Sequence, residues 1–187
     1  MPAASPMSHA GPQRGLTIIE LMVVVAVIAV LVTLAAPSFR SLIAAQRVKG
    51  INAELVTDLQ FARSEAATRG RPVRIRFNPA AACYVIYTDA TSGQCDCNNT
   101  PVCTDEVSRE EIKTVKLPIA NGVSLSASGA TGTIVGFDPR VGKASPPGFV
   151  VGVTSSLRGQ LRTTLNEAGS ASVCTPDGSI SGVPACQ

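Results

Sequence analysis

The sequence is poor in the residues that most often carry acid–base and nucleophilic catalysis. Its only histidine is His9, which lies ahead of a long apolar segment. The rest of the chain therefore has no imidazole for a Ser/His or Cys/His pair and no histidine metal ligand. Its 16 glycines show no phosphate-binding pattern, and Asp138 and Glu167 are isolated acids in turn-like settings. We expect no enzyme, no metal site and no cofactor.

Excess charge, repeats and long linkers are scarce as well. The chain has 16 lysines and arginines against 13 acidic residues, a formal net charge of +3, which is too small to indicate a nucleic-acid partner. We find no internal repeat and no linker long enough to split the chain. Its 187 residues leave room for one modest domain beside the apolar segment.

The dominant feature is a nearly unbroken apolar segment from Leu16 to Ala36. As a helix rising about 1.5 Å per residue, it is long enough to cross a hydrocarbon core of about 30 Å. Its one charged side chain is Glu20, and an isolated carboxylate costs about 2.5–3.5 kcal/mol at the bilayer centre and less near an interface. The segment therefore predicts a membrane span whose Glu20 needs a partner.

The polar leader MPAASPMSHAGPQRG ends in a small residue, Gly15, ahead of the apolar run, whereas an ordinary secretory signal is cut after its apolar run. A cut after Gly15 would make Glu20 the fifth residue of the freed chain. This combination resembles the prepilin signal of type IV pilins and of the pseudopilins of type II secretion, whose mature chains usually begin with Phe where this sequence has Leu16. The alternative is a signal anchor, or an uncleaved signal peptide with a chance acidic residue.

The resemblance implies that a prepilin peptidase of the inner membrane cuts after Gly15 and methylates the new amine of Leu16. It also implies that Glu20 pairs with the terminal amine of a neighbouring subunit, since two buried charges that are costly alone are tolerated as a pair. The single span would lie in the bacterial inner membrane. The implied partners are the other pilins or pseudopilins of a filament and the inner-membrane assembly platform.

The charges that flank the span do not support an orientation with the leader in the cytoplasm. The leader offers Arg14, whereas Arg40, Arg47 and Lys49 follow the span, and positive residues favour the cytoplasmic side. We still expect the downstream domain in the periplasm, because long domains translocate largely regardless of charge. The six cysteines also suit an oxidising compartment.

Beyond the span the pattern becomes that of an amphipathic helix. Apolar residues recur at spacings of three and four, and polar residues lie elsewhere around the axis; the apolar set is Val48, Ile51, Leu55, Leu59, Ala62 and Ala66, and the polar set is Lys49, Asn52, Asp58, Arg63 and Arg69. Pro37 predicts a kink or local melting within this helix, because proline lacks the amide donor. We expect the helix to end at Arg69-Gly70-Arg71-Pro72 and to pack on the chain's own domain.

A second resemblance comes from the end of this helix. Residues 54–77 read ELVTDLQFARSEAATRGRPVRIRF, which is similar to the GspH/FimT group of minor pilins and pseudopilins. In that group an F/Y-A-R-S-E-A helix end leads into a strand, and Phe61-Ala62-Arg63-Ser64-Glu65-Ala66 matches this motif. The second resemblance narrows the family suggested by the first.

After Pro72 the apolar period changes from helical to alternating. We expect short strands between glycine-rich and proline-rich turns; they are Val73–Phe77, Cys83–Tyr87, Thr114–Leu117, Val123–Ala127, Ile134–Phe137, Phe149–Val153 and Leu161–Leu165. The fold class is therefore α+β, a long amino-terminal helix packed on an antiparallel β domain of two small sheets. The expected division is a leader at 1–15, the helix at 16–70 with its span at about 16–37, and the β domain at 71–187.

Six cysteines allow fifteen disulfide connectivities, so spacing alone does not fix the pairing. Cys174 and Cys186 bracket a short carboxyl-terminal loop, and we expect them to be joined, as in many pilins. The other four cluster around a hairpin and the loop after it; they are Cys83, Cys95, Cys97 and Cys103. Zinc binding is the alternative for this cluster, but paired C-x₂₋₄-C knuckles are missing, and disulfides are the favoured interpretation.

DNA binding is the main functional alternative. Some FimT-type minor pilins capture DNA for transformation with a carboxyl-terminal G-R-x-R segment, and the corresponding place here, Gly169-Ser170-Ala171-Ser172, has neither arginine. Because phosphate attraction grows with the number of cations presented, DNA is not the favoured partner. Two arginine pairs could still form a basic face, although solvated strand faces are the commoner explanation; they are Arg158 with Arg162 and Arg74 with Arg76.

The sequence therefore favours a non-catalytic minor pilin or pseudopilin subunit, assembled into a type IV pilus or a type II secretion pseudopilus. A membrane-anchored periplasmic binding module is an alternative from a different class. Only the filament subunit requires processing at Gly15, which separates the two hypotheses. Both machines use this signal, so the sequence does not choose between them.

Overall fold

The computed structural model describes residues 15, 17–88, 95–103, 110–119, 122–130 and 132–187, with the side chain of Pro37 left out. The chain forms two compact units, Met1–Phe39 and Arg40–Gln187. The helix α1 (Ile18–Arg69) runs from the first unit into the second, close to the range of 16–70 that the sequence predicts. Gly70 ends the helix with a φ of +62°, a left-handed conformation that glycine adopts without strain.

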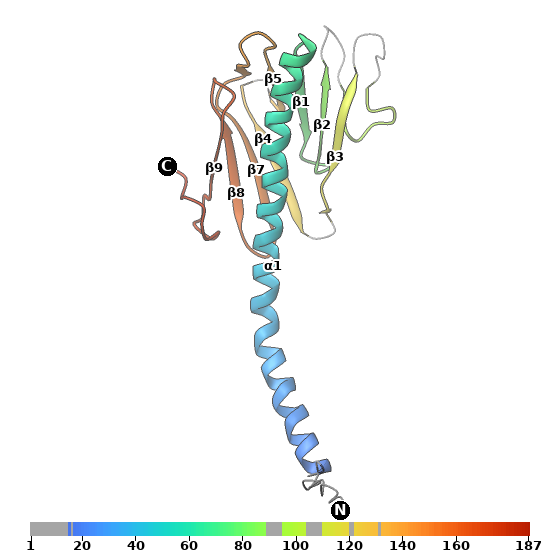
Figure 1. Cartoon of the computed structure of the whole chain (residues 1–187), viewed down its shortest axis with the longest axis vertical. Helices are drawn as coiled ribbons and strands as arrows, with labels where there is room; N and C mark the ends of the chain where they lie inside the picture. Colours follow the sequence, from blue (N-terminus) through green and yellow to red (C-terminus); the bar gives the residue numbers. More distant parts are fainter. Residues whose placement is uncertain (1–14, 16, 89–94, 104–109, 120–121, 131) are drawn as a thin grey trace, which may run out of the picture. The chain divides into compact units, whose positions relative to one another are not determined.

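Two antiparallel sheets make up the rest of the second unit (Figure 1). The first sheet has the order β3-β2-β1-β5-β6 and comprises β1 (Val73–Asn78), β2 (Cys83–Thr88), β3 (Glu111–Lys116), β5 (Ile134–Phe137) and β6 (Ala144–Ser145). The second sheet has the order β4-β7-β8-β9 and comprises β4 (Val123–Ser128), β7 (Phe149–Ser155), β8 (Gln160–Leu165) and β9 (Ala171–Cys174). The α+β class with two small antiparallel sheets is confirmed.

The predicted strands all occur, and two further strands were not predicted. β3 begins at Glu111, earlier than the expected Thr114, because the charged residues before Thr114 hide the alternation. β6 has only two residues, and β9 reads Ala-Ser-Val-Cys. Such short, small-residue strands carry little periodic signal, and their pairing partners alone define them.

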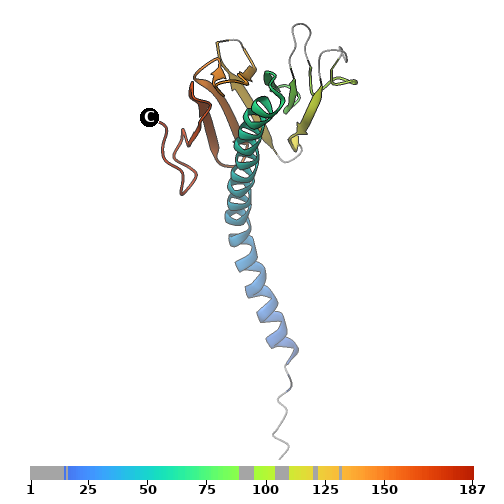
Figure 2. The ribbon, with the colours of Figure 1, turned by 45° about the horizontal axis from the view of Figure 1, so that its top comes forward.

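Within the second unit, α1 lies over both sheets. In Figure 1, β1 to β3 lie on one side of the helix and β7 to β9 on the other, and Figure 2 shows the same arrangement from another angle. The predicted apolar face of the helix is buried, with exposed fractions of 0–1% at Val48, Leu55, Leu59, Ala62 and Ala66. Ile51 packs against the same core and is half-buried.

An aromatic cluster joins the two sheets beneath the helix. The ring of Phe77 on β1 lies 5.5 Å from that of Tyr84 on β2 and 5.7 Å from that of Phe149 on β7, measured between centroids. All three side chains are essentially inaccessible to solvent. Because aromatic pairs at such distances add about 0.5–1.5 kcal/mol beyond their burial, Phe77 is a central contact between the sheets.

The first sheet is covered on its other face as well. Every residue of β2 is buried, although an antiparallel strand with one solvated face alternates between buried and exposed. Tyr84 and Ile86 face the helix core, whereas Cys83, Val85 and Tyr87 belong to a separate cluster with three further cysteines. The cysteine-rich segment 95–103 therefore supplies the cover for this outer face.

Candidate functional site

The start of α1 carries the residues of the expected processing and assembly site. Gly15 is exposed, whereas Leu16 lies outside the described residues, so cleavage and N-methylation there stay predictions. Thr17 caps the helix, because its Oγ1 accepts a hydrogen bond from the backbone N–H of Glu20 at 3.3 Å. Thr17 and Glu20 have the T-x-x-E spacing of a capping box. This signal was available in the sequence and was missed.

Glu20 is the one charged residue between Leu16 and Phe39. It lies in the first turn of α1, where unpaired backbone N–H groups and the helix dipole favour a negative charge. The large apolar side chains from Ile18 to Leu34 are 48–80% exposed. Among the described residues, α1 is long and apolar enough to cross a membrane, judged by length and composition. The first unit therefore presents an apolar helix surface with a single carboxylate in the first turn of the helix.

The helix is uninterrupted at Pro37, so the local melting considered for this position does not occur. Proline removes one hydrogen bond of the helix, but the bonds on either side can still form. One turn earlier, the hydroxyl of Thr33 donates to the carbonyl oxygen of Val30 at 2.7 Å. The kink expected at Pro37 stays a prediction.

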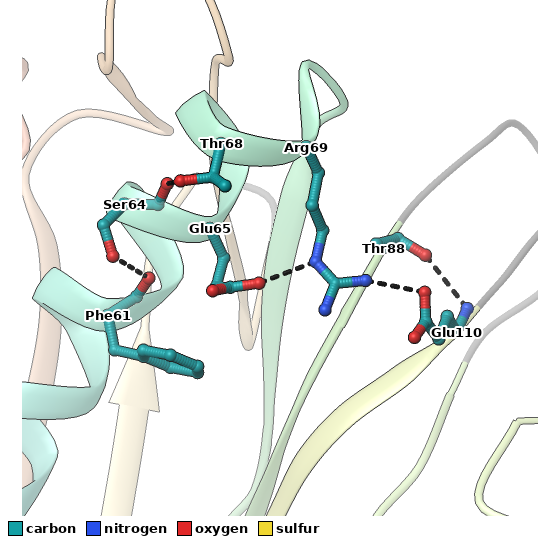
Figure 3. Close-up of polar contacts among 7 residues, drawn as sticks. All are labelled: Phe61, Ser64, Glu65, Thr68, Arg69, Thr88 and Glu110. Atoms are coloured by element: carbon teal, nitrogen blue, oxygen red, sulfur yellow. Dashed lines mark hydrogen bonds and ion pairs between the residues drawn. The ribbon is translucent and has the colours of Figure 1, made fainter.

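The F-A-R-S-E-A motif lies in the last turns of α1, where Figure 3 shows its polar contacts. Arg69 joins the helix to the first sheet: its guanidinium lies 2.6 Å from a carboxylate oxygen of Glu65 and 2.6 Å from one of Glu110. The backbone N–H of Glu110 in turn donates to Thr88 Oγ1 at 2.9 Å. The motif's glutamate thus has a structural role, fixing the helix end against the entry to β3.

Two buried polar residues of α1 fix the helix to the two sheets. The Asp58 carboxylate accepts hydrogen bonds from the Tyr84 hydroxyl at 2.7 Å and from Lys113 Nζ at 2.7 and 2.8 Å. Asn52 Oδ1 accepts a hydrogen bond from the Thr163 hydroxyl of β8 at 2.8 Å. Asn52 and Asp58 are only 3% and 4% exposed, so each sheet has its own buried polar link to the helix.

The helical pattern predicted that Asn52 and Asp58 lie elsewhere around the axis, away from the packed face, and this prediction was wrong. Each lies three residues from Leu55, so helical spacing puts both beside the buried stripe. Their burial is possible because partners on the two sheets satisfy them. The spacing was visible in the sequence, but the partners belong to strands distant in the chain.

All six cysteines form disulfides in the structure. Cys174 and Cys186 are joined, as expected, and the cluster of four pairs as Cys83–Cys97 and Cys95–Cys103. These two bonds tie the segment 95–103 to the start of β2 and close it on itself. In the described part of the chain, no group of three or more His, Cys, Asp or Glu side chains is arranged to hold a metal ion.

The arginines considered for DNA contact lie in different settings. Arg158, in the β7–β8 turn, and Arg162, on the outward side of β8, are both exposed. Arg76 on β1 is partly covered and lies 3.4 Å from a carboxylate oxygen of Asp96. The pair Arg74 and Arg76 therefore does not present two equivalent cations, whereas Arg158 and Arg162 are open to solvent.

The isolated acids fulfil the structural roles that turn residues usually have. Asp138 borders a surface cavity of about 260 Å³ beside Arg74, and its Oδ1 accepts backbone N–H bonds from Val141 at 3.0 Å and Arg140 at 2.8 Å. These hydrogen bonds lower the pKa of Asp138. Glu167 pairs with Lys143 at 2.7 Å. A carboxylate held this way is ionised and engaged in its turn, which is unsuited to general-base catalysis.

Two family models match the chain. The model described as Type II transport protein GspH matches residues 53–173, and the Prokaryotic N-terminal methylation motif matches residues 11–36. No curated protein matches it significantly. Among solved structures, it is similar to the minor pseudopilin EpsH from the Type 2 Secretion System of Vibrio cholerae, at 14% identity over 73% of this chain and 98% of that chain, with a TM-score of 0.48.

The chain is also similar to the solved structure of the type IV minor pilin FimU of Pseudomonas aeruginosa PAO1. In one crystal form the identity is 16% over 73% of this chain and 94% of that chain, with a TM-score of 0.46. In another form the identity is 16% over 74% of this chain and 91% of that chain, with a TM-score of 0.47.

A long amino-terminal helix, apolar and then amphipathic, followed by two antiparallel sheets, defines a pilin-like subunit. The GspH model covers well over half of the chain. The chain belongs to this GspH family of minor pseudopilins and pilins. Proteins of this family are structural subunits, and the apolar helix with its methylation motif is the membrane-anchoring part of such a chain.

Proposed function

We propose that this protein is a non-catalytic minor pilin or pseudopilin that is held in the bacterial inner membrane by one span and then incorporated into a filament. Its second unit would lie in the periplasm, and its partners would be the other pilins, the prepilin peptidase and the assembly platform. The observation that carries the proposal is Glu20, the single carboxylate in an exposed apolar helix. It lies five residues after Gly15, the small residue at which a prepilin signal would be cut.

The position of Glu20 suits a role that appears only on assembly. The free N–H groups of the first helical turn stabilise its charge while the subunit is alone. Cleavage after Gly15 would leave a methylated amine on Leu16, a positive charge at the same end of each subunit. In the apolar filament core, a carboxylate and an amine from neighbouring subunits would each be costly unpaired and tolerable together.

Two substitutions separate the assembly role of Glu20 from its capping role. Glu20→Gln keeps the capping-box residue type but removes the charge, whereas Glu20→Ala removes both. We expect both variants to insert in the membrane and both to be lost from sheared filaments by at least about tenfold, since about 1.4 kcal/mol already gives a tenfold change.

Thr17→Val serves as the matched control, because it removes the cap without touching the charge. It should weaken the first helical turn by about 1 kcal/mol and leave filament incorporation largely intact. Normal incorporation of Glu20→Gln would show that the charge is dispensable and would contradict the proposal.

Between the two machines, we favour the pseudopilus of a type II secretion system. The support is the description of the family model, Type II transport protein. Deletion of the gene should then retain secreted enzymes in the periplasm and leave surface pili intact. Loss of pili with normal secretion would assign the subunit to a type IV pilus instead.

DNA uptake is the second candidate, and the exposed pair Arg158 and Arg162 is the observation that favours it. Binding through phosphates would be strongly salt-dependent. A salt titration of DNA binding by the full chain in detergent, with Arg158→Ala/Arg162→Ala as the variant, tests it. Tight, salt-sensitive binding that the double variant loses would establish this role beside assembly.

A further inference from the structure

Three segments from distant parts of the chain lie at the end of the second unit at which α1 enters, beside the β1–β2 turn, whose Ala82 carbonyl accepts from the N–H of Leu117 at 2.9 Å and whose neighbouring acid Asp96 is paired with Arg76. We call the three segments the entry end and define them as helix residues 40–49, the β3–β4 connection at 116–119 and 122, and the β7–β8 turn at 155–159. The last two segments are tied together, because the N–H of Ser156 donates to the carbonyl of Gly122 at 2.8 Å and the N–H of Gly122 to that of Ile119 at 2.9 Å.

The carboxyl-terminal loop connects the helix to this turn. Lys49 Nζ donates to the carbonyl of Ser181 at 2.7 Å, and the neighbouring Ile180 packs directly on Gly159, where an added Cβ would lie 2.9 Å from its Cδ1. Ala44 is buried in the same region, at 4% exposure. The three segments of the entry end are therefore linked to one another by direct or loop-mediated contacts, and they include the first turns of α1 within this unit (Figure 1).

The entry end carries charge of only one sign. Its cations are Arg40, Arg47, Lys49, Lys116 and Arg158, and its three segments contain no aspartate or glutamate. Over the whole chain the two signs are nearly balanced, at 16 against 13. The nearest acid along the carboxyl-terminal loop, Asp177, is engaged with Thr175 and Ser179 at 2.8 Å each. Cations elsewhere in the second unit lie beside acids, such as Arg69 beside Glu65 and Lys143 beside Glu167, so these three segments differ in having a net positive charge.

Large apolar side chains are exposed among these cations. Leu42 and Ile43 on the helix are 55% and 56% exposed, Ile119 is 56% exposed, and Leu157 in the turn is 66% exposed. Leu157 directly precedes Arg158, so an apolar side chain and a cation project from the same turn. Cations interleaved with exposed apolar residues are typical of surfaces that lie in a lipid interface, with apolar parts in the acyl boundary and cations among headgroups.

We propose that the entry end binds the anionic headgroups of the bilayer that holds the apolar helix, before the subunit is assembled. The proposal rests on the membrane span of the proposed function. Arg40 directly follows Phe39, the last residue of the apolar unit, so this end is joined to the membrane segment by the backbone itself. It also explains why the larger group of positive residues follows the span, against the usual bias.

Other partners fit this surface less well. The cations are mixed with apolar side chains, and the chain's net charge of +3 is small, whereas nucleic-acid surfaces present clustered cations. An acidic face of a neighbouring subunit would require that subunit to be present. A lipid surface is the partner available to an unassembled chain, and its attraction for basic residues acts within about one Debye length.

The experiment uses the fact that the chain has no tryptophan. The full-length protein carries single substitutions Leu157→Trp, Val141→Trp or Val27→Trp and is reconstituted into vesicles of phosphatidylcholine, alone or mixed equally with phosphatidylglycerol, with brominated acyl chains as quencher. Val141 is the matched control, since it is 63% exposed in the loop that packs, through Gly142, on Arg63 near the opposite end of α1. Val27 reports insertion of the span.

We expect the emission of Leu157→Trp to shift to shorter wavelength and to be quenched at least twofold more in the anionic vesicles than in the neutral ones. Val141→Trp should show neither effect, and Val27→Trp should be quenched in both. Replacing Arg47, Lys116 and Arg158 by glutamine in the same chain should lower the quenching of Leu157→Trp in anionic vesicles to the level seen in neutral vesicles. The same number of changes away from the entry end, at Arg63, Arg71 and Arg140, should not.

Three outcomes would overturn the proposal. Leu157→Trp could behave like Val141→Trp while Val27→Trp is quenched, which would leave the membrane span and the filament role intact. Protection of Leu157→Trp only after a second subunit is added would assign the surface to a protein neighbour. Absence of quenching of Val27→Trp would remove the membrane span itself, and with it both this proposal and the proposed function.

Discussion

At the scale of single residues, Asp58 joins α1 to the first sheet through a buried polar cluster. Its carboxylate is 4% exposed and links Tyr84 of β2 and Lys113 of β3 to the helix. We expect Asp58→Ala to lower the free energy of unfolding by about 2–4 kcal/mol, because it leaves the buried Tyr84 hydroxyl without an acceptor and Lys113 with only the exposed carboxylate of Glu54. Urea unfolding of the full chain in detergent measures this.

Glu54→Ala is the matched control for Asp58→Ala. Glu54 lies 3.6 Å from the same lysine, but its side chain is 52% exposed, and exposed pairs contribute about 0–1 kcal/mol. If the two substitutions had similar effects, the buried link through Asp58 would not be what holds the helix on the first sheet.

The same cluster makes stability fall at alkaline pH. Burial, and then its hydrogen bond to Asp58, raise the pKa of the Tyr84 phenol, and the hydrogen bond to Asp58 raises the pKa of Lys113. An unfolded tyrosine and lysine lose their protons near about pH 10, whereas the folded groups keep theirs. The stabilisation is therefore complete below about pH 10 and is lost as the pH rises through the raised values.

Melting temperatures measured on either side of about pH 10 test this dependence. Tyr84→Phe removes the phenol and should reduce the alkaline loss of stability relative to the unsubstituted chain. An equally steep loss in Tyr84→Phe would assign the effect to other groups.

At the scale of elements, the cysteine-rich segment acts as the cover of β2. Replacing Cys83 and Cys97 with serine should expose Val85 and Tyr87, which now lie in the cluster beneath the segment. Loops of this size closed by a disulfide contribute about 3 kcal/mol. We expect a lower melting temperature and faster proteolysis within residues 95–103, while the Cys174–Cys186 bond stays formed.

Peptide mapping of the unreduced protein provides the check on pairing. It should recover linked peptides for Cys83–Cys97, Cys95–Cys103 and Cys174–Cys186 and no free thiol. Stoichiometric zinc with free thiols would contradict the structure in this region.

The sequence predicted elements well wherever one residue pattern sufficed. The stripe from Val48 to Ala66 has a helical period, and the residues around Ile75 and Val151 alternate or are uniformly apolar, so period alone assigned helix and strands. It could not predict β9, whose identity comes from pairing with β8. It also could not predict the link between Asp58 and Lys113, since a buried acid is recognisable only when its distant partner is known.

Likewise, only part of the candidate site could be predicted from the sequence. Glu20 stands out in the sequence because it is a charge within an apolar run, and Gly15 because it is a small residue directly before that run. The entry end does not stand out, since its cations, from Arg40 to Arg158, are up to 118 residues apart in the chain and meet only through tertiary contacts. Surfaces of this kind need a structure to be seen.

At the scale of the whole molecule, the two units would divide the work of the proposed filament subunit. The unit Met1–Phe39 supplies an apolar helix with one carboxylate, and the unit Arg40–Gln187 supplies a β domain with three disulfides. Disulfide-stabilised domains suit an oxidising compartment, as the proposed periplasmic location would require. Family membership and architecture are those of a subunit that acts by assembly.

The central claim is that the chain is cut after Gly15 and then assembled through the new amino terminus at Leu16 and the carboxylate of Glu20. The most direct measurement is the intact mass and amino-terminal sequence of the protein isolated from membranes of cells with an active prepilin peptidase. Our account predicts a chain that begins at Leu16 with one added methyl group. A chain that begins at Met1, or beyond the apolar segment, would contradict it and would leave a membrane-anchored or released β domain.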